Sequence, residues 1–360
     1  MYFIKKDSAD GRLLIWQCSL NMVADKPVFG HGHGAFQAKY MYYQAEYMNA
    51  HPENRFASLA DNVLHPFNEY LLVLTEHGCA GFCIVILLVL LIFRAYHSKP
   101  DEAKLTAMMS ILALAVFSFF SYPFRYPFTW LLLFLNISVI YNSSVNRNYS
   151  FDTFALKRFI FPKIYLRIIT CLLSVGLLMT SVTLMRTEMK WKRIARFSLG
   201  NVLPEYDKLY RWLGKDGLFL YNHAAELYEA KEYEKSLAVF EQSTRYHNDM
   251  DVQMFLAANY SALGKYVEAE QHYKMAADMC PARFRPLYEL AKLYDDVGRV
   301  EEACDLAKKI IDKDVKVPSF TIDAMKKEMR LLIEVRKTAD EPASEVQTFK
   351  PSGNEDTKAG

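Results

Sequence analysis

The chain has 360 residues, of which 52% are hydrophobic, and its 43 basic and 41 acidic residues leave a net charge of +2. This near-balance, with no long basic run, excludes a protein that binds nucleic acid mainly through charge. A densely apolar stretch from about residue 71 to 185, followed by a charge-rich stretch from residue 190, excludes a uniformly soluble enzyme and indicates a membrane part and a soluble part.

Residues 1–68 contain three short motifs and no signal peptide. The motifs are Gly11-Arg12-Leu-Leu-Ile-Trp16, Gly30-His-Gly32-His-Gly34 and His65-Pro-Phe-Asn68. A signal peptide is excluded because Lys5, Lys6 and Asp7 follow the first four residues with no apolar core. The charges considered below place this segment on the outer side of a membrane. We therefore expect that Met1 is not the natural start and that further spans precede it. This chain is then a C-terminal fragment that is incomplete and nearly inactive by itself.

Four segments are apolar enough to be membrane-spanning helices. A helix rises about 1.5 Å per residue, so crossing roughly 30 Å of hydrocarbon takes about 20 mostly apolar residues. The predicted spans within residues 69–186 are 71–95, 105–122, 127–141 and 168–185. The third span is short, but without it the run Trp130-Leu-Leu-Leu-Phe-Leu135 would be exposed to water.

Basic residues between the spans predict their orientation, because such residues are retained on the cytoplasmic side. Two loops are basic, and their residues are Arg94, Lys99 and Lys104 in the first and Arg147, Lys157, Arg158, Lys163 and Arg167 in the second. The loop over 121–127 has only Arg125 and is predicted to face outward, together with residues 1–68 and everything after residue 186. A basic cluster over 186–196 opposes this orientation, unless it meets anionic lipid or the soluble part.

Small residues recur at a regular spacing in the soluble part. Ser236, Ala269 and Ala303 are 33 and 34 residues apart, and Gly264 and Gly298 stand at equivalent turns. This pattern resembles the tetratricopeptide repeat, a helix-turn-helix unit whose stacked copies present a surface for a protein or peptide. Lys231 replaces the turn glycine in the first unit, which is typical of an atypical terminal repeat.

The repeats complete the predicted domain organisation. We expect an all-α fold in which multi-pass transmembrane helices are followed by a tetratricopeptide-repeat solenoid. A connecting helix is predicted over 187–216 and the repeat domain over 217–337, closed by a helix at 326–337. The polar residues 338–360 are predicted to be a disordered tail.

The N-terminal motifs, followed by Glu76-His-Gly78 at the start of the first span, resemble the large periplasmic loop of the O-antigen ligase and polymerase family. The resemblance covers about residues 11–141. It implies a multi-pass protein of the bacterial inner membrane with this loop in the periplasm. The orientation predicted from the loop charges then puts the repeats in the periplasm as well. The implied reaction is a metal-independent transfer, with no cofactor, of a glycan from a polyisoprenyl diphosphate to an acceptor hydroxyl, usually on the lipid A core.

Two residues match the family's functional positions. Arg12 matches the loop arginine, and a guanidinium can hold two oxygens of a diphosphate leaving group. His65 matches the family's histidine, and an imidazole suits removal of the acceptor's proton at neutral pH. Each has a purely structural alternative, since Arg12 could form a cation-π pair with Trp16 and His65 could cap the start of the first span.

Four further residues are predicted to support the site. Trp16 shares a helical face with Arg12, and Asn68 and Glu76 share one with His65, so either could orient the imidazole. Arg125 is a candidate for a second phosphate contact or for an anchor at the lipid interface. No metal is predicted, because the six cysteines form no Cys-x-x-Cys pair and two histidines at 31 and 33 without a third ligand make a poor site.

Other functions fit parts of the same sequence. A polymerase that joins glycan units, or a ligase that loads protein side chains, would use the same chemistry. A non-catalytic membrane-anchored scaffold whose working part is the repeat domain, for interactions among envelope proteins, is the alternative from a different class.

Overall fold

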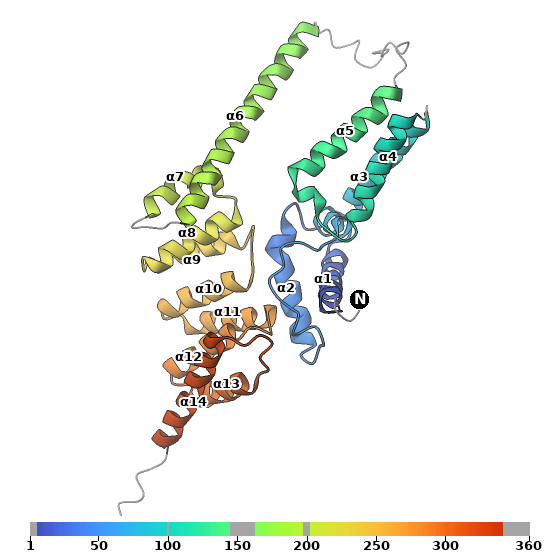
Figure 1. Ribbon diagram of the computed structural model, residues 1–360. Helices are drawn as coiled ribbons and strands as arrows, with labels where there is room; N and C mark the ends of the chain where they lie inside the picture. Colours follow the sequence, from blue (N-terminus) through green and yellow to red (C-terminus); the bar gives the residue numbers. More distant parts are fainter. Residues whose placement is uncertain (1–5, 99–100, 145–162, 197–201, 341–360) are drawn as a thin grey trace, which may run out of the picture. The chain divides into compact units, whose positions relative to one another are not determined.

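The computed structural model describes residues 6–98, 101–144, 163–196 and 202–340 (Figure 1). Within these ranges every long element is an α-helix, α1 to α14, and there is no strand. The all-α prediction is therefore confirmed for the described residues. The chain divides into two compact units, residues 1–286 and 287–360, and each is described by itself.

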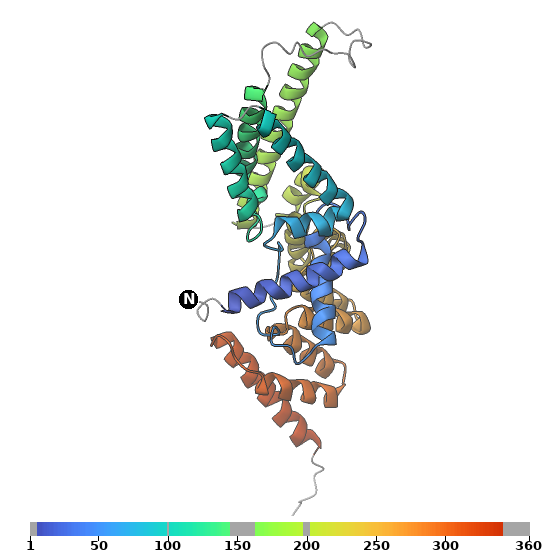
Figure 2. The same cartoon turned by 90° about the vertical axis from the view of Figure 1, so that its right-hand side faces the viewer.

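The first unit begins with two helices that cross each other, α1 (Lys6–Asp25) and α2 (Ala35–Ala50) (Figure 2). Their sequences place apolar residues on one face at helical spacing, and this face is buried. The almost fully buried side chains are Leu14, Cys18 and Met22 of α1 and Phe36, Tyr40 and Met41 of α2. Residues 51–68 follow without a helix or strand and lead to α3.

A break at Gly78 in α3 (Glu69–Ser98) explains the glycines of the histidine motif. Gly78 has φ 63° and ψ −164°, so the helix ladder is interrupted there. The freed carbonyls of Thr75 and Glu76 accept hydrogen bonds from the N–H groups of His31 (2.9 Å) and Gly32 (2.8 Å). A Cβ on Gly30 would lie 2.5 Å from the Glu76 backbone. The glycine motif is therefore a close backbone docking site.

Three apolar helices lie side by side: α3, α4 (Glu102–Phe117) and α5 (Pro127–Ser144) (Figure 1). Ala107 and Met108 of α4 and Ile140 of α5 form a buried cluster against the end of α3. At the other end of the group, Tyr70 of α3 donates to the Ala115 carbonyl of α4 at 2.9 Å. α4 and α5 therefore run along α3, while many apolar side chains on their outer faces remain exposed.

Two helices among the described residues, Glu69–Ser98 and Arg167–Arg196, are long and apolar enough to cross a membrane, judged by length and composition. Pro127–Asn142 is a shorter apolar helix. The predicted spans at 105–122 and 127–141 correspond to α4 and α5, which have 16 and 18 residues. The basic loop residues Lys99, Arg147, Lys157 and Arg158 lie outside the described residues.

Helix α6 (Lys163–Arg196) continues well beyond the predicted fourth span. Its last turns pack with α7 (Leu203–Leu213) and with α8 (Gly217–Glu229). Trp191, Tyr206 and Phe219, one from each helix, are buried together in this cluster. The described part of the predicted connecting helix 187–216 thus contains the end of α6 and a separate helix, α7.

The next helices form two pairs, α8 with α9 (Tyr233–Ser243) and α10 (Met250–Ala262) with α11 (Tyr266–Met279). Small residues let the paired helices approach: the Ser236 hydroxyl donates to the Ala224 carbonyl at 2.8 Å, and Ala257 and Ala269 are fully buried. Lys231 adopts φ 62° where Gly264 has φ 73°. The residue that departs from the repeat pattern therefore takes the same turn conformation.

The second unit contains most of α12 (Arg285–Asp296), α13 (Val300–Asp312) and α14 (Phe320–Asp340). Tyr288 donates to Glu328 at 2.7 Å, which joins α12 to α14. Lys326 donates to the carbonyls of Ile311 and Lys313 at 2.7 Å each, which satisfies the end of α13. The closing helix predicted at 326–337 is thus longer at both ends, and the predicted tail lies outside the described residues from 341 onward.

Candidate active site

The Arg12 guanidinium lies between two segments that are far from it in sequence. Its carbon is 5.3 Å from the centroid of the Phe67 ring, and Nη1 donates to the Phe120 carbonyl at 3.2 Å. The aromatic partner of Arg12 is therefore Phe67, and not Trp16 as in the predicted cation-π alternative. Arg12 remains partly exposed and has several N–H groups directed to neither contact, which a diphosphate could occupy.

Trp16, one turn after Arg12, holds the histidine motif against α1. Its indole N–H donates to the Pro66 carbonyl at 2.9 Å. The next residue, Phe67, has φ 53°, a left-handed conformation that costs a residue with a Cβ roughly 1–2 kcal/mol. Such conformations persist where the surroundings determine them. Here the conformation places the Phe67 ring under Arg12.

The His65 imidazole contacts the loop that joins α4 to α5. Its Nε2 accepts from Nη1 of Arg125, and its ring lies 4.8 Å from that of Tyr122. Tyr122 also contacts the Phe67 ring at 5.4 Å. Burial, and then the charge of Arg125, lower the pKa of His65 to about 4. The imidazole is therefore neutral at pH 7, as a general base must be.

The loop over 118–126 is itself fixed to the start of α3. The Glu69 N–H donates to the Ser118 carbonyl at 2.9 Å, and the Glu69 carboxylate accepts from the Phe124 N–H at 3.0 Å. Arg125 ends the short 3-10 turn Pro123–Arg125. Three segments, α1, the His65 loop and the 118–126 loop, thus meet around Arg12, His65 and Arg125.

The other two predicted supporting residues have different contacts. Asn68 caps α3, since its side-chain oxygen accepts from the Leu71 N–H at 3.0 Å. Glu76 accepts weakly from the Phe36 N–H at 3.4 Å and lies 3.4 Å from His33 Nδ1. The His65 imidazole instead contacts Arg125 and Tyr122. Tyr122 and Phe67 were not predicted from the sequence, although both are aromatic residues beside prolines in the two loops that are predicted to face outward.

A second group of polar side chains lies where the glycine motif meets α3. The donor atoms of His33, Glu76 and His77 all lie within 4.8 Å of one another. Glu76 is buried, whereas both imidazoles are exposed. Two histidines and a carboxylate are zinc ligands in other proteins, so this group could hold a metal ion. Next to the break at Gly78, Glu76 and His77 lie beside His33, so His33 has two further potential ligands that the sequence did not predict. His31 points elsewhere, with Nε2 2.9 Å from the Met22 carbonyl.

Comparison with known proteins bears on the N-terminal part of the chain. Residues 3–86 match the model of the O-Antigen ligase family. The match includes Arg12, Trp16, His65, Asn68 and Glu76 and stops before Arg125. No curated protein matches the chain. The match supports, for residues 3–86, the resemblance to this family that the motifs carry.

Proposed function

We propose that the protein is an inner-membrane glycosyltransferase of the O-antigen ligase type. It transfers a glycan from a polyisoprenyl diphosphate to an acceptor hydroxyl, such as one on the lipid A core. The observation that carries this proposal is that Arg12 and His65, from two separate motifs, are joined by the contacts of Phe67 and Tyr122. If Arg12 and His65 each had only a separate structural role, they would not need to lie near each other.

The proposed chemistry uses a cation for the leaving group and a neutral base for the acceptor. Arg12 binds diphosphate oxygens through parallel N–H donors and stabilises the charge that develops as the bond between the sugar carbon and the diphosphate oxygen breaks. His65 accepts the proton of the acceptor hydroxyl as its oxygen bonds to that carbon. The products are the transferred glycan, the free polyisoprenyl diphosphate and a protonated imidazole, which returns its proton to water.

Arg125 has a defined part in this scheme. In the structure it donates to Nε2 of His65, the nitrogen that would otherwise accept a proton. A diphosphate attracts Arg125 more strongly than a neutral imidazole does, because both partners are then charged. Donor binding therefore draws Arg125 from His65 and frees the base when the leaving group is in place. No metal is required in this scheme, and the His33, Glu76 and His77 group lies outside it.

The arrangement of the helices supports a periplasmic site. Arg12 and His65 contact the 118–126 loop, so α3 and α4 connect two segments on one side of the membrane. Residues 37–62 contact residues 248–283, so an even number of crossings separates them. Four spans, α3 to α6, satisfy this condition. The loops at the opposite ends of these helices are basic, which supports an outer location for the site and the helix pairs.

The helix pairs α8–α9 and α10–α11 are proposed to be tetratricopeptide repeats, with α12 and α13 as a third repeat. Their small buried residues, their spacing and the equivalent turns at Lys231, Gly264 and Gly298 support this assignment. As in other stacked helix pairs, a protein or peptide is the expected ligand.

The test is to replace the gene in its host by variants, which keeps neighbouring genes in place, and to measure surface glycan. Arg12→Ala and His65→Ala are expected to abolish most of it. Arg55→Ala is a matched control, since Arg55 also lies over an aromatic ring, Phe56, at 4.7 Å. His51, an exposed histidine of the same segment, is the second control. Normal glycan in both site variants at wild-type abundance would favour a non-catalytic scaffold.

A further inference from the structure

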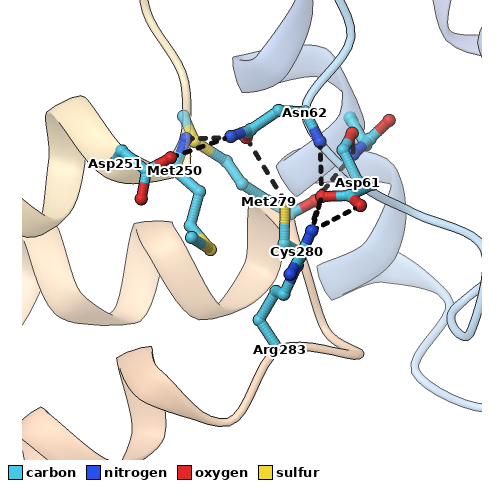
Figure 3. Close-up of polar contacts among 8 residues, drawn as sticks. Asp61, Asn62, Met250, Asp251, Met279, Cys280 and Arg283 are labelled. Atoms are coloured by element: carbon cyan, nitrogen blue, oxygen red, sulfur yellow. Dashed lines mark hydrogen bonds and ion pairs between the residues drawn. The ribbon is translucent and has the colours of Figure 1, made fainter. Parts of the chain in front are cut away.

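The loop that carries His65 is held at its other end by α10, α11 and the turn after α11 (Figure 3). Arg283 Nη2 donates to both carboxylate oxygens of Asp61, at 2.7 and 2.9 Å. This ion pair is half exposed, with side-chain exposures of 54% and 52%. Exposed pairs contribute little by themselves, so the ion pair sets the orientation of the loop more than its stability.

Asn62 makes the more specific contact. Its side-chain oxygen accepts from the N–H of Met250, the first residue of α10, at 3.1 Å, and its amide donates to Asp251 at 3.2 Å. The first N–H groups of a helix have no partner within the helix. Asn62 thus provides a hydrogen-bond acceptor for one of the free N–H groups at the start of α10. Because its oxygen must face the Met250 N–H and its amide must face Asp251, the position of the loop along α10 is fixed.

Gln44 of α2 is a buried residue that contacts both the loop over 51–68 and the end of α11. Its side chain is fully buried, and its amide donates to the Met279 carbonyl at 2.7 Å and to the Asp61 carbonyl at 3.1 Å. Its side-chain oxygen accepts from Tyr40 at 2.9 Å. One amide therefore connects α2, the loop and the end of α11. A buried polar side chain with all these partners specifies a single arrangement.

These contacts end only three residues before His65. The loop has no helix or strand of its own, and beyond His65 it contains the left-handed residue Phe67. We propose that the α10–α11 pair is a positioning element of the transfer site, which acts through Asp61, Asn62 and Arg283 to hold His65 against Tyr122 and Phe67 beneath Arg12. The pair is then part of the catalytic unit. This inference rests on the proposed function.

The proposal makes a graded prediction for three variants. Asn62→Ala removes the register contact and is expected to lower kcat by roughly 10-fold to 10²-fold with little change in KM, because misplacement of a base affects the chemical step more than donor binding. Arg283→Ala is expected to lower kcat less. The exchanged pair, Asp61→Arg with Arg283→Asp, is expected to recover most of the loss of the Arg283 variant.

The experiment combines two measurements on the full chain. Transfer is measured in membranes of the host carrying each variant, with lipid-linked glycan extracted from that host as donor. Hydrogen exchange of the purified protein is measured for residues 51–68 and, as a check of folding, for residues 254–279, which leave out the Met250 N–H that Asn62 itself binds. Arg245→Ala and Asn49→Ala, at exposed positions after α9 and near the end of α2, are the matched controls.

The supporting result is faster exchange at 51–68, unchanged exchange at 254–279 and lower kcat for Asn62→Ala, with both controls normal. Unchanged exchange at 51–68 would overturn the docking. Faster exchange with normal kcat would overturn the positioning role. If even the unaltered chain shows no transfer, the proposed function fails, and the exchange data still decide whether α10 and α11 hold the loop.

Discussion

At the scale of single residues, the site depends on how one arginine and one histidine are presented. Arg12 has an aromatic ring on one side and a carbonyl at one nitrogen, so its plane is fixed while other N–H groups stay available. His65 is kept neutral by burial and by Arg125. Neither feature follows from residue type alone, and both depend on Phe67, Tyr122 and Arg125 in the two loops that contact α1.

Arg12→Lys tests whether the guanidinium acts as a planar fork. A lysine keeps the positive charge but presents a point charge that cannot bind two oxygens in one plane or stack on Phe67 in the same way. We expect the lysine variant to retain most of the defect of Arg12→Ala in the initial rate of glycan transfer. A rate close to that of the unaltered protein would show that charge alone suffices.

The pH dependence of transfer tests the state of His65. With a pKa of about 4 the imidazole remains neutral well below pH 6.5, so the acid limb of kcat/KM is expected near pH 4. Arg125→Ala removes the smaller of the two causes, and the limb should move upward yet stay below 6.5 because burial remains. A limb near 6.5 in the unaltered protein would contradict the assignment.

The lowered pKa of His65 also makes the stability of the folded protein depend on pH in a definite direction. Between about pH 6.5 and 4 the unfolded chain binds a proton at His65 that the folded chain does not, so the contribution of this residue to stability falls as the pH falls through that window. His65→Gln is expected to flatten the dependence of the melting temperature on pH over this window. An unchanged dependence would show that His65 titrates normally in the folded protein.

At the scale of elements, the break in α3 organises the N-terminal part. Cys79 and Ala80, after the break, donate to the carbonyls of Pro27 and Val28 at 2.8 and 3.0 Å, so the loop and the helix exchange backbone hydrogen bonds in both directions. A Cβ on Gly78 would lie 2.3 Å from the Val28 oxygen. The docking therefore requires glycine at this position.

Gly78→Ala is expected to destabilise the protein by more than about 2 kcal/mol, because the left-handed φ costs roughly 1–2 kcal/mol and the clash adds to it. Gly11→Ala is the matched control. Gly11 lies inside α1 with nothing within 4 Å of its Cβ position, so the change is expected to stabilise slightly. Thermal unfolding of the detergent-solubilised protein measures both. Equal melting temperatures for the two variants would refute the close docking.

The sequence predicts the individual helices better than it predicts the tertiary contacts between them. The apolar runs and the spacing of Ser236, Ala269 and Ala303 anticipate the helices, because these patterns are local. The motifs of Arg12 and His65 identify the candidate site. The contact between Asn62 and Asp251 joins residues 189 apart, and no local pattern encodes it. The break at Gly78 is hidden for a similar reason, since its cause is the loop that docks there.

At the scale of the whole molecule, contacts across the chain constrain the topology. The hydrogen bonds between the first 68 residues and α10 and α11 predict that these segments share one side of the membrane. An impermeant thiol reagent on cells with a permeabilised outer membrane is expected to label a cysteine at Glu268, an exposed position of α11. A cysteine at Ser98, at the end of α3, should react only after lysis. The reverse pattern, measured above the native cysteine background, would invert the topology.

The most direct test of the central claim is the rate of glycan transfer in membranes that contain equal amounts of each variant. Arg12→Ala and His65→Ala are expected to lower the rate on the order of 10²-fold to 10⁴-fold, as for a positioned acid or base. Arg55→Ala and His51→Ala should transfer at the unaltered rate. If either site variant also transfers at the unaltered rate, Arg12 and His65 do not form the transfer site and the account is wrong.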